Sequence, residues 1–179
     1  MSPAGETSPF DPLPILIALA DAKVDFVLIG GLAGNALGSS QATYDVDVAY
    51  SREPENLERL AGALTEIGAE LRVAGLDDPR ELGFQLDAET LRRSANFTFN
   101  TRLGPLDILA EPAGMRSYTE LRRDSLTVEI DDREIRVASL DHLIAMKQAA
   151  GRPKDRIMVE EYIALAEERR HRAASGEAG

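Results

Sequence analysis

The sequence contains no cysteine, so disulfide bonds and thiolate metal sites are excluded. It also lacks an uninterrupted apolar run of membrane-spanning length, which is about 20 residues. Residues 1–14 carry Pro, Glu and Asp where a secretory leader would carry basic residues and an apolar core. We therefore expect a cytoplasmic protein that does not insert into a membrane.

Basic residues are in the minority, with 20 Lys and Arg against 31 Asp and Glu and a formal net charge of −11. Broad, nonspecific affinity for nucleic acid depends on neutralising phosphates with Lys and Arg, so this balance argues against it. An RNA or DNA substrate would require a local basic patch. The clusters that could form one are Arg92-Arg93 and Arg122-Arg123.

The length of 179 residues suits one domain with a helical appendage, and a hydrophobic content of 44% is sufficient for a core. Alternating helix and strand patterns, without internal repeats, predict an α/β (α+β) fold. We expect a catalytic core over residues 1–137, a helical part packed on it over residues 138–172, and a disordered tail over residues 173–179.

Apolar residues at helical spacing predict helices over residues 11–22, 54–67, 139–150 and 154–170. Pro54 in the first turn of one helix and Ser139 at the N-cap of another support these assignments. A further short helix is expected over residues 32–37. Buried or alternating runs predict strands over residues 24–29, 46–50, 95–102, 106–109, 126–130 and 134–137.

Three carboxylates stand in strand-like surroundings. Asp45 and Asp47 flank Val46 at the start of a predicted strand, and alternation along a strand points both acids to the same side. Asp107 lies inside an apolar run, where an acid is costly unless it is ligated or hydrogen-bonded. Mg²⁺ takes oxygen ligands, and nucleotidyl transfer depends on it. We therefore predict a Mg²⁺ site at these three acids, with Asp107 also the base for an attacking hydroxyl.

A glycine- and serine-rich stretch precedes the acid pair. The predicted strand over residues 24–29 ends in Gly30 and Gly31, and Gly38, Ser39 and Ser40 follow a few residues later. Backbone N–H groups at a helix start or turn, together with Ser hydroxyls, bind phosphate oxygens. These five residues are predicted to hold a nucleoside triphosphate. Each signal alone is weak, and their conjunction with a third acid favours chemistry over a structural role.

The same residues carry a family resemblance. The set Gly30-Gly31, Gly38-Ser39-Ser40, Thr43 and Asp45-Val46-Asp47 resembles the signature of the DNA polymerase β-like nucleotidyltransferase superfamily, with Asp107 at the position of the third acid. A second stretch, residues 137–147 and 149–155, resembles the minimal nucleotidyltransferases that include the AbiEii and MenT-type toxins of bacterial toxin–antitoxin pairs. The two matches together span residues 24–161.

The resemblance implies a nucleotidyltransferase fold, with a short mixed sheet, flanking helices and a C-terminal helical part. It implies that the three acids bind one or two Mg²⁺ ions and that the Gly-Ser loop holds the nucleoside triphosphate. It further implies that Lys147 contacts the phosphates and that Asp155 is an additional active-site acid. For the toxin branch, it implies transfer of a nucleoside monophosphate to the 3′ end of tRNA by a toxin that a cognate antitoxin restrains.

One departure from the family pattern leaves alternatives open. Many relatives have Arg-x-Thr before the acid pair, where this chain has Gln41-Ala42-Thr43. Gln lacks the fixed charge of a guanidinium, so either the affinity for the triphosphate is weaker or Lys147 or Arg52 supplies the charge instead. One alternative to the tRNA-modifying toxin is a nucleotidyltransferase that acts on an aminoglycoside-type small molecule, for which the net charge of −11 is natural, or on a protein hydroxyl. The other is an inactive nucleotide- or partner-binding module.

Overall fold

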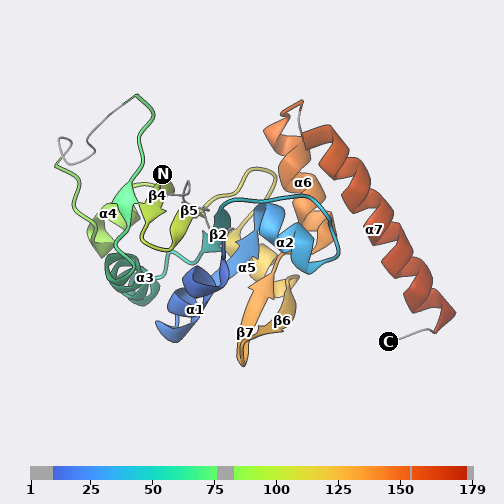
Figure 1. Cartoon of the computed structure of the whole chain (residues 1–179), viewed down its shortest axis with the longest axis horizontal. Helices are drawn as coiled ribbons and strands as arrows, with labels where there is room; N and C mark the ends of the chain where they lie inside the picture. Colours follow the sequence, from blue (N-terminus) through green and yellow to red (C-terminus); the bar gives the residue numbers. More distant parts are fainter. Residues whose placement is uncertain (1–9, 76–82, 154, 177–179) are drawn as a thin grey trace, which may run out of the picture.

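The computed structural model describes residues 10–75, 83–153 and 155–176, and a seven-stranded mixed sheet lies at its centre (Figure 1). The strand order is β3-β4-β5-β2-β1-β7-β6. β2 pairs antiparallel with β1 and parallel with β5, whereas β1 pairs parallel with β7. The strand bounds are β1 Phe26–Ile29, β2 Val46–Tyr50, β3 Glu70–Leu71, β4 Asn96–Thr101, β5 Gly104–Leu109, β6 Leu126–Ile130 and β7 Arg133–Val137.

Helices flank this sheet, which confirms the predicted fold class. Their bounds are α1 Leu13–Asp21, α2 Gly30–Ala36, α3 Pro54–Glu66, α4 Ala88–Arg93, α5 Tyr118–Arg123, α6 Leu140–Ala150 and α7 Asp155–Ser175. α3 and α4 pack together at one end of the molecule, and α6 and α7 pack together at the other (Figure 1). Within the described ranges, no helix combines the length and the apolar character that a bilayer span requires.

Most elements lie close to their predicted positions, and β2 has the predicted bounds. The predicted cap of α6 is present, since Ser139 Oγ accepts a hydrogen bond from the His142 N–H at 3.3 Å. The short elements β3, α4 and α5 are not predicted by the sequence patterns. Residues 173–175, which were expected to be disordered, instead continue α7. Two of these three residues are Ala, the strongest helix former, and residues 177–179 lie outside the described part of the chain.

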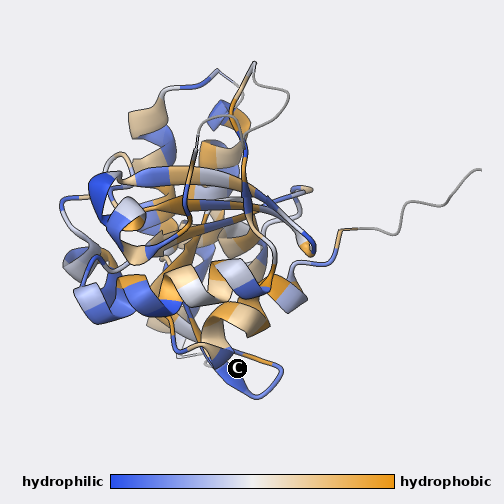
Figure 2. Ribbon diagram, turned by 90° about the vertical axis from the view of Figure 1, so that its left-hand side faces the viewer, coloured by the Kyte–Doolittle hydropathy of each residue, from blue (hydrophilic) through white to orange (hydrophobic). Residues whose placement is uncertain are grey.

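The middle of the sheet is deeply buried. All four residues of β1 are buried, and Val46, Val48 and Tyr50 of β2 are 0% exposed. Strands covered on both faces have near-continuous apolar sequences, which is why β1 and β2 could be recognised. Figure 2 shows hydrophobic and hydrophilic residues side by side along the surrounding helices, as expected for helices that cover a sheet.

The strand register brings two of the predicted acids together. β2 and β5 are neighbours in the sheet, and Asp47 on β2 lies opposite Asp107 on β5. Between these strands the chain makes a long crossover that contains α3, β3, α4 and β4. Neighbouring strands lie about 4.8 Å apart, so carboxylates on the same face of this pair are held close to each other.

Helix α7 approaches α2 closely at a glycine. Tyr162 of α7 is 0% exposed, and a Cβ added at Gly34 would overlap its ring and its hydroxyl oxygen. One turn further along α2, the Leu37 carbonyl oxygen accepts a hydrogen bond from Arg169 of α7 at 3.2 Å. The absence of a side chain at Gly34 therefore permits α7 to lie against the helix that begins at the cleft described below.

Replacing Gly34 with Ala is expected to lower the free energy of unfolding by about 1–3 kcal/mol, because the added methyl group overpacks the contact with Tyr162. Gly62→Ala is the matched control, since Gly62 is an exposed position of α3 where an added Cβ meets nothing within 4 Å. That change is expected to raise the free energy of unfolding by about 0.5–1 kcal/mol. Urea denaturation followed by circular dichroism measures both, and effects of the same sign would contradict the packing argument.

Candidate active site

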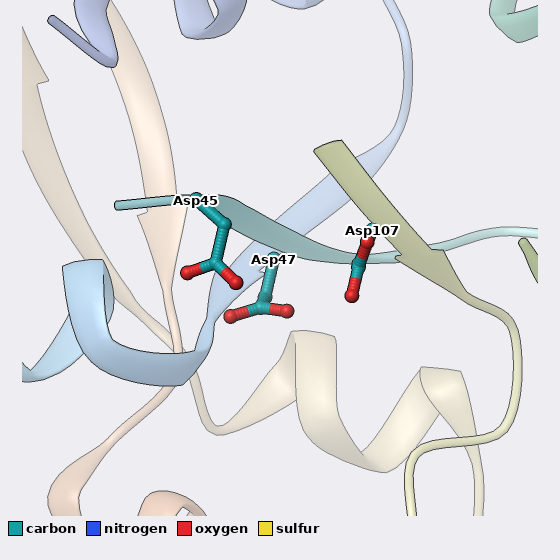
Figure 3. Close-up of side chains that lie close together, drawn as sticks. All are labelled: Asp45, Asp47 and Asp107. Atoms are coloured by element: carbon teal, nitrogen blue, oxygen red, sulfur yellow. The ribbon is translucent and has the colours of Figure 1, made fainter. Parts of the chain in front are cut away.

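Three carboxylates converge at the centre of the sheet (Figure 3). Asp47 extends from β2, Asp45 lies immediately before that strand, and Asp107 extends from the adjacent β5. One carboxylate oxygen from each residue lies within 4.8 Å of the other two. The structure therefore brings together the three acids that the sequence nominated from segments 60 residues apart.

Glycine and threonine residues shape the space around the acids. Gly30 has φ of +68°, and a Cβ added there would overlap the Asp47 carboxylate. An added Cβ at Gly31 would lie 3.0 Å from Thr43 Oγ1. That hydroxyl donates a hydrogen bond to Asp45 Oδ1 at 3.2 Å, which orients the carboxylate. Gly30 is thus required by its close approach to Asp47, and Gly31 lies close to the threonine that contacts Asp45.

Burial and mutual repulsion raise the pKa of two of these carboxylates, those of Asp47 and Asp107. Desolvation by burial is the largest cause that raises the pKa of Asp47 to about 7, and the negative charges of Asp45 and Asp107 raise it further. The charges of Lys147 and Arg152 act in the opposite direction. Burial also raises the pKa of Asp107, while the charge of Arg72 opposes that shift.

The donor set fits a hard divalent cation. Mg²⁺ prefers carboxylate oxygens and usually keeps several of its waters, so three convergent carboxylates beside an open cleft suit it. A bound cation would also relieve the repulsion that raises the pKa of Asp47.

The opposite wall of the site is made by the C-terminal helices. Lys147 of α6 forms an ion pair with Asp155 at the start of α7, with Nζ and Oδ1 3.2 Å apart. The two side chains are 19% and 9% exposed. A carboxylate this deeply buried requires a partner, so the pair fixes where the Lys147 ammonium lies.

A cleft of about 540 Å³ separates the acids from Lys147. It contains seven of the predicted site residues, which are Gly30, Gly31, Asp45, Asp47, Asp107, Lys147 and Asp155. Part of its wall is apolar and comes from Leu109, Leu143, Met146 and Met158. The cleft therefore combines a carboxylate floor, a cationic wall and an apolar surface.

The other three predicted site residues contact helix α7 and do not line the cleft. Gly38, Ser39 and Ser40 lie outside the lining of the cleft and pack against α7. The Ser40 N–H donates a hydrogen bond to Glu161 Oε1 at 3.0 Å, and this bond is the main cause that lowers the pKa of Glu161. The N–H group that was expected to meet a phosphate is thus engaged by a carboxylate of the protein itself.

Sequence reasoning missed or underweighted several residues at the site. Arg72 follows β3 and donates a hydrogen bond to Asp107 Oδ1 at 3.2 Å, but a strand of two residues gives no recognisable pattern. Tyr44 lines the cleft although it is 73% exposed. The sequence signal that could have identified Tyr44 is its position directly before Asp45. Arg152, in the turn between α6 and α7, also lines the cleft.

No protein-family model matches the sequence, and no curated protein matches it. Solved structures do match. The lincosamide antibiotic adenylyltransferase LnuA, determined with lincomycin bound, has a TM-score of 0.56 and 16% identity, covering 85% of this chain and 94% of its own. An antigenic nucleotidyltransferase-like protein from Paracoccidioides brasiliensis has a TM-score of 0.53 and 14% identity, covering 89% of this chain and 76% of its own.

A third similar structure is ANT(2″)-Ia in complex with adenylyl-2″-tobramycin, with a TM-score of 0.50 and 20% identity. The match covers 85% of this chain and 83% of that one. At identities of this size, the likeness shows a shared arrangement of strands and helices. The chain has the nucleotidyltransferase fold.

In the metal-free protein, the Asp47 carboxyl is expected to make the folded state less stable as the pH rises from about 4 to about 7. Its pKa is about 7 when folded against an ordinary value of 3.8, so the folded state binds more protons within this window. Stability then falls with pH and levels off above pH 7. Urea denaturation of the wild type and Asp47→Asn across this range isolates the effect. An unchanged pH dependence in Asp47→Asn would contradict the raised pKa.

Replacing Lys147 with Met is expected to lower the free energy of unfolding by about 3–5 kcal/mol, because Asp155 is left buried without its partner. Arg170→Met is the matched control, since Arg170 pairs with Asp141 at 2.8 Å on side chains that are 64% and 70% exposed. The control is expected to change stability by less than about 1 kcal/mol. Losses of similar size in the two variants, measured by urea denaturation, would refute the assignment of a buried pair.

Proposed function

We propose that the chain is a Mg²⁺-dependent nucleotidyltransferase that transfers a nucleoside monophosphate from a nucleoside triphosphate to an acceptor hydroxyl. The observation that carries this proposal is the convergence of Asp45, Asp47 and Asp107 on one side of a cleft that has Lys147 on the other. The nucleotidyltransferase fold supports it. Nucleotidyl transfer requires both elements, because carboxylates hold the cation and positive groups hold the phosphates.

The chemical step joins the acceptor oxygen to the α-phosphorus of the nucleotide. The bond from that phosphorus to the oxygen that bridges to the β-phosphate breaks, and pyrophosphate leaves. A Mg²⁺ ion held by the three acids would supply charge neutralisation for the phosphates. Asp107 is proposed to accept the proton of the acceptor hydroxyl at a carboxylate oxygen, a role that its raised pKa favours.

Lys147 and Arg152 are proposed to hold the triphosphate. Both line the cleft, and the charge of each acts on Asp47. Their positive charges would take the place of the arginine guanidinium that many relatives have at the position of Gln41. The apolar wall is suited to the nucleobase, since ligand pockets combine apolar surfaces with a few convergent polar groups. Ser39 and Ser40 would join the phosphate contacts only if a phosphate replaced the Glu161 carboxylate.

For the acceptor, we propose the 3′ end of tRNA, as in a toxin restrained by a cognate antitoxin. Support comes from the resemblance of residues 137–155 to the minimal toxin nucleotidyltransferases, together with Lys147 and Asp155 forming an ion pair at the cleft. A second candidate acceptor is a small antibiotic. It is favoured by the similarity to the lincosamide adenylyltransferase and to ANT(2″)-Ia, and by the net charge of −11, which suits a cationic acceptor.

Incubation of the purified protein with Mg²⁺, each of the four α-labelled nucleoside triphosphates and total bacterial tRNA is expected to label tRNA. Asp45→Ala is expected to reduce labelling more than about 100-fold, because it removes a metal ligand. Asp124→Ala is the matched control, since it removes the same charge from an exposed pair with Arg123 outside the cleft. Labelled RNA is resolved on a denaturing gel.

The outcomes separate the candidates. Absence of label on tRNA with all four nucleotides, together with label on lincomycin or tobramycin, would replace the tRNA proposal with the antibiotic one. Absence of label on tRNA, antibiotics and protein acceptors would overturn the enzyme proposal in favour of a binding module. Equal activity in Asp45→Ala and the wild type would exclude the three acids as the metal site.

A further inference from the structure

Asp107 on β5 has Asp47 of β2 on one side. On its other side, toward β4 and β3, lie Thr98 and Arg72. In the strand register, Asp107 on β5 lies opposite Thr98 on β4. Arg72, which follows β3, donates its backbone N–H to the Thr98 carbonyl oxygen at 2.7 Å and its guanidinium to Asp107. The site proposed for catalysis therefore continues toward the β3–β4 edge of the sheet, and the first group along this path is cationic.

An open hollow of about 510 Å³ lies along this edge. Its polar lining consists of Arg72, Thr90, Arg93, Ser94, Asn96 and Thr98. Among the described residues that line it there is no carboxylate, on a chain whose net charge is −11. Local charge decides contact energies because salt screens interactions beyond about 8–10 Å. An anionic ligand therefore meets two guanidinium groups here.

Both arginines remain accessible to a ligand. The Arg72 side chain is 44% exposed and that of Arg93 is 75% exposed. Arg93 pairs with Glu89 of the preceding turn at 2.9 Å, and Arg72 pairs with Asp107. The exposed pair of Arg93 with Glu89 contributes about 0–1 kcal/mol, so a phosphate can replace Glu89. Asp107 is 26% exposed, so a phosphate would share Arg72 with it. Each guanidinium has five N–H donors in a planar fork that matches phosphate oxygens.

The hollow also has an aromatic side. Phe84 and Phe97 both line it, with ring centroids 6.0 Å apart; Phe97 is buried, so the half-buried Phe84 offers the accessible aromatic surface. Nucleic-acid sites for single strands combine positive groups that follow the backbone with aromatic rings that contact bases. The composition of the hollow thus matches the nucleic-acid acceptor of the two candidates.

We propose that this hollow is the subsite for the acceptor strand, where Arg72 and Arg93 bind phosphodiester groups next to the terminal nucleotide of a single-stranded nucleic acid. The inference rests on the proposed function, because it takes Asp107 as the group that faces the acceptor hydroxyl. A strand seated on the β3–β4 edge delivers its 3′ hydroxyl toward Asp107, while the nucleoside triphosphate occupies the cleft on the side of Lys147. Arg72 is then the residue that joins the two parts of the site.

The test is equilibrium binding of a fluorescein-labelled 12-nucleotide single-stranded RNA ending in CCA, measured by anisotropy with Mg²⁺ and without nucleotide. Arg72→Ala and Arg93→Ala are each expected to weaken binding about tenfold at low salt. Each is also expected to reduce the slope of log K against log salt by about 0.7, the value for one phosphate contact on a single strand. Arg93→Ala is the cleaner variant, because its ion-pair partner Glu89 lies outside the proposed metal set.

Arg123→Ala is the matched control. Arg123 is 69% exposed on α5, belongs to the other basic cluster of the sequence and pairs with Asp124. It is expected to leave both the affinity and the salt slope unchanged. Circular dichroism verifies that each variant is folded, and Arg72→Lys is expected to recover part of the binding by restoring the charge. A DNA strand of the same sequence is measured in parallel. Dependence on Arg72 and Arg93 with either strand supports the subsite, and the tighter strand identifies the nucleic acid.

Two results would overturn the subsite. One is wild-type affinity in both Arg72→Ala and Arg93→Ala with RNA and with DNA, and the other is an equal loss in Arg123→Ala. Failure of the subsite is distinguishable from failure of the proposed function. Label transfer to tRNA that is unaffected by Arg93→Ala leaves the enzyme proposal standing without the subsite. Strand binding that depends on both arginines, without label transfer from any nucleotide, supports the subsite but identifies a binding protein and not an enzyme.

Discussion

The constraint on which this structure depends is the confinement of three carboxylates to one small volume. Asp47 and Asp107 sit opposite each other on adjacent parallel strands, with Asp45 beside them, and burial and repulsion raise the pKa of Asp47 to about 7. Bringing these carboxylates together destabilises the folded state, so the rest of the core has to hold the strands in register against that repulsion. The buried β1 and β2 do this, and the crossover from β2 to β5 places the third acid. A site built in this way favours the binding of positive charge.

The second wall of the site depends on how α7 lies against α2. The glycine at position 34 admits the buried ring of Tyr162, and Glu161 holds the backbone N–H of Ser40. At the start of the same helix, Asp155 fixes the Lys147 ammonium. Helix α7 therefore carries both Asp155, which lines the cleft, and the residues that contact α2 and Ser40, which are Tyr162 and Glu161. A displacement of α7 that freed the Ser40 N–H would also move Asp155. The position of the loop at Ser40 and the position of the Lys147 ammonium are therefore coupled through α7.

The sequence was most informative where local pattern and chemistry coincide. Apolar runs located β1 and β2. Asp45 and Asp47 could be chosen because alternation along a strand points both to the same side, and Asp107 because a carboxylate is costly in an apolar run. The direction in which Ser39 and Ser40 face could not be predicted, since it depends on the packing of α7, more than 100 residues further along the chain. Arg72 was missed because β3 exists only through its pairing with β4. The helices α4 and α5 have six residues each, too few for periodicity to show, although Asp87 and Ser117 are N-caps that could have marked them.

Net charge and local charge give opposite indications about the acceptor, and distance decides between them. The charge of −11 acts at long range, where it slows the approach of an anionic strand and attracts a cation. At contact, a ligand experiences the groups within a Debye length of about 8–10 Å. Beside Asp107 those groups include Arg72, and the hollow beyond it adds Arg93. The overall acidity therefore limits nonspecific binding of nucleic acid without excluding a specific strand whose phosphates reach these two arginines. A polycationic acceptor would be attracted by the net charge of the molecule as a whole, but the described residues that line this hollow offer it no carboxylate.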